Sequence, residues 1–152
     1  MIITLKDGSK REVQEGISVI DLAKEISEGL ARVATAGRVD GKVVDLRYNL
    51  NEDCNVEILT FDDEDGKKAY WHTTSHIMAQ AIKRLYKDVK LAIGPAIDGG
   101  FYYDFDTEYR FSEADFEKIE AEMKKIIKED LPIERFELPR SEAIKLMKDA
   151  GE

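Results

Sequence analysis

The sequence has little of what builds disulfide-rich, membrane-spanning or nucleic-acid-coating proteins. It has one cysteine and three prolines in 152 residues, so an intrachain disulfide is excluded and a reducing, cytoplasmic location is expected. No hydrophobic run approaches the roughly 20 residues that cross a membrane, and the N-terminus lacks a signal-peptide pattern. The 32 acidic residues outnumber the 23 lysines and arginines, for a formal charge of −9. This charge argues against broad, nonspecific adhesion to nucleic acid.

Basic residues are nevertheless concentrated in one short stretch of the first half of the chain. They are Arg32, Arg38, Lys42 and Arg47. Such a stretch can form a modest basic face that makes a local RNA contact, although each residue read singly is an ordinary solvated charge.

Residues 1–61 have the pattern of a small sheet that packs on one helix. Ile3 and Leu5 begin an alternating strand, residues 7–8 predict a turn, and residues 11–14 predict the returning strand of a hairpin. Ser18, with Asp21 three residues later, predicts a helix that continues at helical spacing to Leu30. Further strands are expected at 33–36, 43–46 and 56–59. This order predicts a ubiquitin-like β-grasp domain, with Cys54 as a buried apolar filler.

The charged segment 62–68 reads as a linker, and residues 69–152 read as a second, α+β domain. Its first helix is expected over 69–86, and a glycine-rich loop should separate strands at 89–93 and 101–105. Ser112 and Asp115 predict the start of a long helix that Pro132 ends. A strand is expected over 133–138, and a last helix from Ser141 to Gly151.

The chain's two histidines, His72 and His76, lie four residues apart in the first of these helices. At this spacing both imidazoles project from one face and can meet one water, one metal ion or one substrate group. Histidine can also act as base or acid near neutral pH. The pair shares its face with Ala79 and Lys83, away from an apolar stripe. That stripe consists of Trp71, Met78, Ile82 and Leu85.

Two less specific interpretations of the histidine pair stay open. An arbitrary pair at this spacing is more often structural, partly exposed or hydrogen-bonded. Zinc also accepts two histidines at this spacing, but it needs a third and usually a fourth ligand. The glycine-rich loop that follows has neither the lysine and hydroxyl residue of a P-loop nor the spacing of a dinucleotide fingerprint, so it is interpreted as turn-forming.

Two groups of motifs resemble a known family. The segments Ile3-Thr4-Leu5-Lys6-Asp7-Gly8-Ser9 and Ala36-Gly37-Arg38-Val39-Asp40-Gly41 resemble a TGS domain. They are followed by the acidic linker, His72-x-x-x-His76, Ala92-Ile93-Gly94-Pro95 and Gly100-Phe101-Tyr102-Tyr103-Asp104. In this order the motifs resemble the N-terminal part of bacterial threonyl-tRNA synthetases, over essentially the whole chain.

The resemblance implies a division of the chain and a function. Residues 1–61 would be the TGS domain, and residues 69–152 the first part of the editing domain, which hydrolyses serine wrongly attached to threonine tRNA. His72 and His76 would position and deprotonate a water or anchor the terminal ribose. Tyr103 would supply a hydroxyl or a wall for the seryl group. Without the resemblance, Tyr102 and Tyr103 read as two strand residues on opposite faces, one in the core and one at the surface, an interpretation that suits Tyr102. Phe101 and Phe105 read as core residues.

The resemblance also implies the context of the parent enzyme. The parent would be an aminoacyl-tRNA synthetase, a threonine–tRNA ligase that uses ATP and whose catalytic core holds zinc. It would be a cytoplasmic homodimer whose partner is the acceptor end of threonine tRNA mischarged with serine. No cofactor or metal is expected on residues 1–152.

The sequence departs from the family's pattern at one point. The family completes its editing pocket with a later Cys-x-x-x-His segment and a lysine, and no histidine or cysteine follows His76 here. We therefore expect a fragment of a longer synthetase that does not edit on its own. Two alternatives remain: a non-catalytic TGS-type module that binds RNA or protein, and a zinc hydrolase in which Asp104 or a partner chain completes the ligands.

Overall fold

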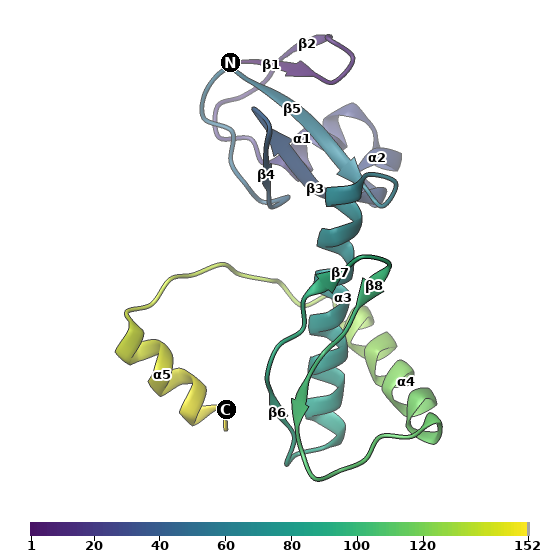
Figure 1. Cartoon of the computed structure of the whole chain (residues 1–152). Coiled ribbons are helices and arrows are strands. Elements are labelled where there is room, and N and C mark those ends of the chain that lie inside the picture. The colour runs from purple at the N-terminus through teal and green to yellow at the C-terminus, as the bar shows by residue number, and fades with distance from the viewer. Residues whose placement is uncertain (152) are drawn as a thin grey trace. The chain divides into compact units, whose positions relative to one another are not determined.

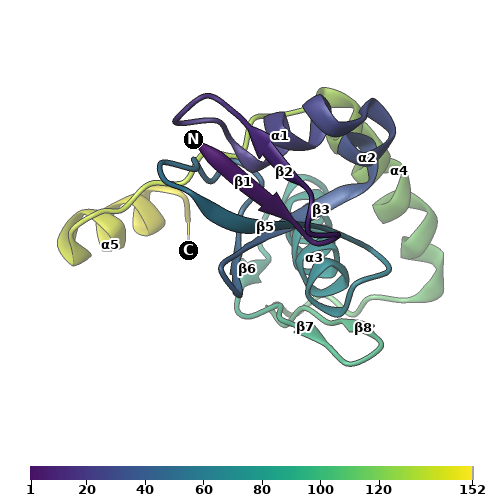
Figure 2. The same cartoon turned by 90° about the horizontal axis from the view of Figure 1, so that it is seen from above.

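The computed structural model describes residues 1–151, which divide into two compact units. The first unit, Met1–Trp71, contains a five-stranded sheet in the order β2-β1-β5-β3-β4. Its strands are β1 (Ile2–Leu5), β2 (Lys10–Glu12), β3 (Ala34–Val39), β4 (Lys42–Val44) and β5 (Cys54–Thr60). β1 and β5 are parallel at the centre and the other neighbours are antiparallel; Figure 2 shows β2, β1, β5 and β3 side by side. This is the predicted β-grasp arrangement.

One helix, α1 (Val19–Ile26), covers a face of this sheet (Figure 1). It begins where the sequence predicts, because the Asp21 N–H donates to Ser18 Oγ at 3.2 Å. Val19 and Leu22 are fully buried and pack with Ile3 from β1. Cys54 belongs to the same apolar cluster, which confirms its role as a buried filler.

The helix predicted to continue to Leu30 is instead two helices. Ser27 takes an extended conformation that ends α1, and its Oγ accepts the Leu30 N–H at 3.1 Å to begin α2 (Glu28–Val33). Serine hydroxyls bind nearby backbone N–H groups and so favour caps over helix interiors. Gly29 therefore lies inside α2 and does not mark the end of a helix.

The charged segment 62–68 has a different local form from the linker that its composition predicts. Helix α3 (Glu64–Leu85) begins within it, and the Asp63 carbonyl accepts the first helical hydrogen bond, from the Lys67 N–H at 2.8 Å. Glu64 and Lys68 form an ion pair of 2.8 Å one turn apart, an arrangement that supports a helix. Gly66 permits this start, because a Cβ there would lie 2.0 Å from the Thr60 carbonyl oxygen. That two domains meet at 62–68 stays a prediction.

The second unit begins at His72 and contains the rest of α3 with α4 (Glu113–Glu129) and α5 (Arg140–Asp149). Figure 1 shows α4 beside α3, and the buried Ile82, Val89 and Ile119 form the core between elements of this unit. Its strands are two-residue pairs: β6 (Lys90–Leu91) with β9 (Phe105–Asp106), and β7 (Ala96–Ile97) with β8 (Gly100–Phe101). The strands predicted at 89–93 and 101–105 are therefore present only as shorter pieces.

Asp115 holds the start of α4 and confirms the predicted cap. The Ser112 N–H donates to its carboxylate at 2.9 Å, and the hydroxyls of Tyr109 and Tyr86 donate at 2.7 and 2.8 Å. Asp115 is only 3% exposed. The Ser112 N–H first, and then the two tyrosine hydroxyls, lower the pKa of this carboxyl.

The strand predicted over 133–138 does not form. Residues 131–139 are irregular and exposed, and no strand in the described range 1–151 pairs with them. An isolated strand is not stable without a partner, however well its residues alternate. Helix α5 follows Pro139 at Arg140, one residue before the predicted Ser141, and has no buried residue.

Trypsin is expected to cut the native chain first at Arg135. The backbone there is irregular, whereas Lys67 and Lys68 lie in a helix, and proteases require locally extended, mobile backbone. Mass spectrometry of early digests identifies the site, and Arg135→Gln should slow the first cut while Lys68→Gln leaves it unchanged. Initial cleavage at 67–68 in the native chain would contradict the helical start of α3.

Asp115→Asn is expected to lower the denaturant midpoint of unfolding, while Glu117→Gln, an exposed change on the same helix, leaves it unchanged. Because the pKa is lower in the folded chain, the stabilising effect is full above the ordinary value of 3.8 and is lost as the pH falls below it. The difference in denaturant midpoint between the wild-type chain and Asp115→Asn should therefore become smaller in acid. An equal gap at pH about 7 and about 2.5 would show that the carboxylate charge does not matter.

Candidate functional site

Helix α3 brings the two histidines into direct contact. The Nε2 atoms of His72 and His76 are 2.9 Å apart, and the ring centroids are 4.6 Å apart with an interplanar angle of 56°. A hydrogen bond between two ring nitrogens requires one N–H donor and one bare acceptor. The neutral pair therefore contains one Nε2–H ring and one Nδ1–H ring.

The buried side of α3 explains why these rings stay accessible. Ser75, Ala79 and Ile82 are at most 3% exposed, whereas both histidines lie at the border of this side and are exposed. The predicted stripe is only partly correct: Ile82 and Met78 face the core, but Leu85 is 39% exposed. Trp71 contacts Phe61 within the first unit, at 6.0 Å between ring centroids.

The pKa of His76 lies below its ordinary value of 6.5, because burial disfavours the charged ring and the neighbouring His72 adds a smaller repulsion. At neutral pH this imidazole is therefore unprotonated. A neutral imidazole can accept a proton, which is what a general base must do.

Tyr103 lies next to His76. The two ring centroids are 6.4 Å apart at 78°, an edge-to-face arrangement, and Phe105 stacks on the tyrosine ring at 5.0 Å. Tyr102 is 43% exposed. The structure thus brings His72, His76 and Tyr103 together, although their chemical roles stay predictions.

Asp104 is exposed and takes part in the backbone pairing of its segment. Among residues 1–151, no group of three or more His, Cys, Asp and Glu side chains could hold a metal ion. The third ligand that a zinc site needs is therefore not supplied by Asp104. That the chain carries no metal remains a prediction for metal analysis.

Comparison with known proteins gives a family for the first domain and relatives for the whole chain. Residues 1–60 match the family model of the TGS domain. The chain is 63% identical over 152 residues to the threonine–tRNA ligase of Caldanaerobacter subterraneus subsp. tengcongensis, and 66% identical over 150 residues to that of Acetivibrio thermocellus. The chain is similar to the N-terminal region of the threonine–tRNA ligases. It spans 24% of the length of these relatives.

Within the TGS domain, the expected basic face is largely neutralised. Arg38 donates to Glu57 at 2.8 Å and to Asp65 at 3.0 Å, and Arg47 pairs with Asp45 at 2.8 Å. Sequence reasoning treated these arginines as available charges, because their carboxylate partners are mostly distant in the chain. Two of the four predicted basic residues are therefore engaged inside the domain.

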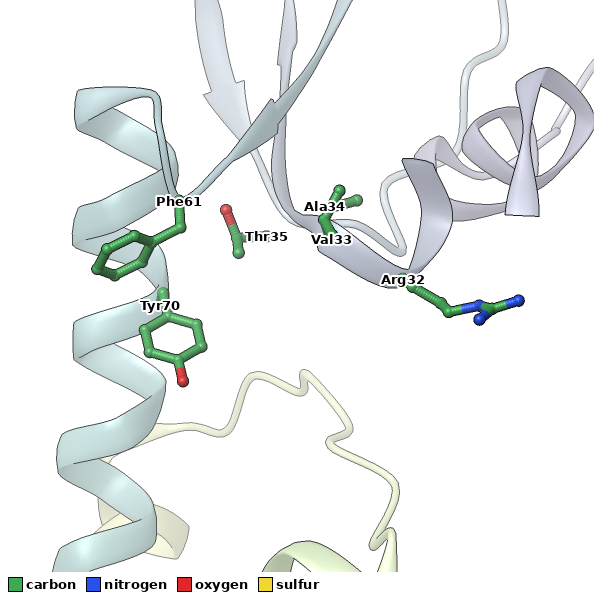
Figure 3. Close-up of a pocket in the computed structure, with 6 residues that line it drawn as sticks. All are labelled: Arg32, Val33, Ala34, Thr35, Phe61 and Tyr70. Carbon is green, nitrogen blue, oxygen red and sulfur yellow. The ribbon is translucent and has the colours of Figure 1, made fainter. Parts of the chain in front are cut away.

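The first unit also contains an open pocket of about 410 Å³. It is lined by Arg32, Val33, Ala34, Thr35, Phe61 and Tyr70 (Figure 3). The rings of Phe61 and Tyr70 meet edge to face at 5.2 Å, while the Arg32 side chain points away from them. None of the predicted site residues lies here.

Two residues near the histidine pair were missed by sequence reasoning. Ser75 is fully buried between His72 and His76 in the chain, and its Oγ lies 2.9 Å from the Gly94 carbonyl oxygen. Gly94 was interpreted only as a turn former, although its φ is not positive. A serine at the border of an apolar helix stripe was the available signal, since a buried hydroxyl needs a partner.

Within residues 1–151, no helix is long and apolar enough to cross a membrane.

The His76 ring protons are expected to titrate with a midpoint below 6.5 when followed by nuclear magnetic resonance (NMR) against pH. His72→Ala should raise that midpoint without restoring the ordinary value, because burial is the larger cause and remains. The ring-proton signals that are missing from the spectrum of His76→Ala identify those of His76. A midpoint that does not move in His72→Ala would show that the two rings are not electrostatically coupled.

Proposed function

We propose that the chain is the N-terminal part of a threonine–tRNA ligase, and that its second unit takes part in hydrolysing serine wrongly attached to threonine tRNA. The observation that carries this proposal is the contact between His72 and His76, 2.9 Å between Nε2 atoms, with Tyr103 beside it. It is supported by the ligases of which this region forms the N-terminal quarter.

Such a ligase needs a second site for a physical reason. A pocket that accepts threonine cannot strongly reject the smaller serine, because one missing methyl group changes binding by only about 1–3 kcal/mol. Destroying the wrong product by hydrolysis increases fidelity beyond that limit.

Ester hydrolysis requires a water that attacks the carbonyl carbon and a base that takes the water's proton. His76 suits the role of base, because its low pKa keeps the ring neutral. The attacking water would bind at the Nε2 that now contacts His72, so one ring turns aside as the water enters. His72 would then orient the water or bind a terminal ribose hydroxyl.

Tyr103 would form the wall next to the seryl group. Its ring is fixed by stacking on Phe105, at 5.0 Å and 20°, so it can limit the size of the bound amino acid. The developing oxyanion also needs positioned hydrogen-bond donors, and these would come from elsewhere in the ligase. The 152-residue chain alone should therefore not edit at a useful rate.

The remaining properties of the parent follow from the same proposal. The parent attaches threonine to its tRNA with ATP, in a catalytic core that also holds zinc and that lies outside these residues. It works in the cytoplasm as a homodimer. Its partner at the histidine pair is the acceptor end of threonine tRNA charged with serine.

In the full-length ligase that carries this sequence, His76→Ala is expected to slow deacylation of seryl-tRNA by about a hundredfold or more, the usual contribution of acid–base groups. His72→Ala should also slow it, because it removes the group that orients the water or binds the ribose. Threonine activation, measured by pyrophosphate exchange, should stay unchanged. Tyr103→Leu should also impair deacylation, whereas Tyr102→Leu, at the exposed neighbouring position, should not.

Unchanged deacylation in His72→Ala, with activation and fold intact, would exclude this histidine from the mechanism. If Tyr103→Leu and Tyr102→Leu changed the deacylation rate equally, Tyr103 would not form the wall of the pocket.

A further inference from the structure

We propose that Ser75 and Gly94 are positioning residues that hold Tyr103 against His76. Their importance for catalysis rests on the proposed function, but the placement itself is tested without tRNA. Neither residue points into the pair, so each acts through a neighbour.

Ser75 ties the helical turn that bears both histidines to the segment after β6. Its Oγ lies 2.7 Å from the His72 carbonyl oxygen and 2.9 Å from the Gly94 carbonyl oxygen, and the residue is fully buried. A hydroxyl has one hydrogen to donate, so it serves these two acceptors by sharing or alternation. The bond to Gly94 connects residues 19 positions apart and is partly buried, and hydrogen bonds are stronger where water is partly excluded.

Gly94 brings the tyrosine ring close to the backbone. A Cβ at position 94 would lie 2.0 Å from Cδ2 and 2.4 Å from Cε2 of Tyr103, so the ring occupies the space of a side chain. The backbone of this segment is also paired with the segment that contains the tyrosine. The Ala92 N–H donates to the Asp104 carbonyl at 3.0 Å, and the Asp104 N–H donates to the Ile93 carbonyl at 2.7 Å.

These contacts form one continuous path from helix to ring. Ser75 fixes Gly94, the missing side chain of Gly94 admits the Tyr103 ring, and that ring reaches an edge-to-face contact with His76 at 6.4 Å. Removing the Ser75 hydroxyl leaves the partly buried Gly94 carbonyl without this donor. The segment should then move outward, and the tyrosine ring should move with it.

NMR of the histidine ring protons in the 152-residue chain tests the first step. Tyr103→Leu removes the ring current at His76 and defines the reference shift. Ser75→Ala should move the His76 signals in the same direction and raise the titration midpoint, because the ring becomes more solvated. Thr73→Ala removes an exposed threonine hydroxyl from the same helix and should leave both readouts unchanged.

Signals of Ser75→Ala that stay at the wild-type values, while those of Tyr103→Leu move, would overturn the role of Ser75. Equal responses to Thr73→Ala and Ser75→Ala would also overturn it, since any lost hydroxyl would then suffice.

A second measurement does not depend on Ser75→Ala folding. Gly94→Ala should destabilise the chain in denaturant unfolding, because the added methyl meets the tyrosine ring. In a Tyr103→Ala background the ring is absent, and Gly94→Ala should lose more than half of its cost. Additive effects of the two changes would show that Gly94 does not serve the tyrosine.

The failure of this inference is distinguishable from failure of the proposed function. If His72→Ala in the full-length ligase deacylates normally while the NMR shifts and the unfolding cycle behave as described, the editing role is wrong and the positioning is right. If deacylation depends on His72 and Tyr103 but Ser75→Ala leaves His76 unchanged, the positioning is wrong and the editing role stands.

Discussion

The burial of one side of α3 determines where the groups of the candidate site lie. Ala79 and Ile82 pack into the interior and Ser75 bonds to the Gly94 carbonyl, so the helix has a fixed rotation about its axis. That rotation leaves His72 and His76 at the edge of the packed side, where water can reach them. A turn of the helix by one position would either bury the imidazoles or separate them from Tyr103.

The properties of the histidine pair follow from that placement. The two histidines are four residues apart on one helix face, which brings their Nε2 atoms to 2.9 Å from each other. Each ring therefore sets the hydrogen-bonding state of the other. Partial burial and the neighbouring ring lower the pKa of His76 and keep it neutral. Charges in the TGS domain behave differently, since Arg38 and Arg47 pair with carboxylates of their own domain. The first unit therefore has fewer unpaired positive charges for binding a phosphate backbone than its number of basic residues suggests.

Much of the first unit could be predicted because its signals are local. The turn at residues 7–8, the Ser18 cap and the alternating strands each depend on neighbours in the chain, and they are found where expected. Ser27 was missed because a cap in the middle of an apolar helical pattern depends on a competition between side chain and backbone. The helical form of residues 64–68 was missed because a charged, glycine-containing composition indicates a linker, although Glu64 and Lys68 pair one helical turn apart.

The candidate site could be predicted only in part. The spacing of the histidines indicated their contact, and a family resemblance indicated Tyr103. The link from Ser75 through Gly94 to Tyr103 joins three parts of the chain, so no local pattern could reveal it. The strand expected over 133–138 is an error of the other kind, because it was predicted but does not form. Alternating residues favour an extended strand, but a strand also needs a partner strand.

The hydrogen bond between the two imidazoles is the central feature, and nitrogen-15 shifts of the four ring nitrogens measure it most directly. At a pH well above the ordinary histidine value of about 6.5, the structure predicts one ring in the Nε2–H form and the other in the Nδ1–H form. His72→Ala removes the partner ring, so the His76 ring should no longer be held in one of the two forms by this hydrogen bond. Both rings in the Nε2–H form would contradict the structure, since two N–H groups cannot share one hydrogen bond.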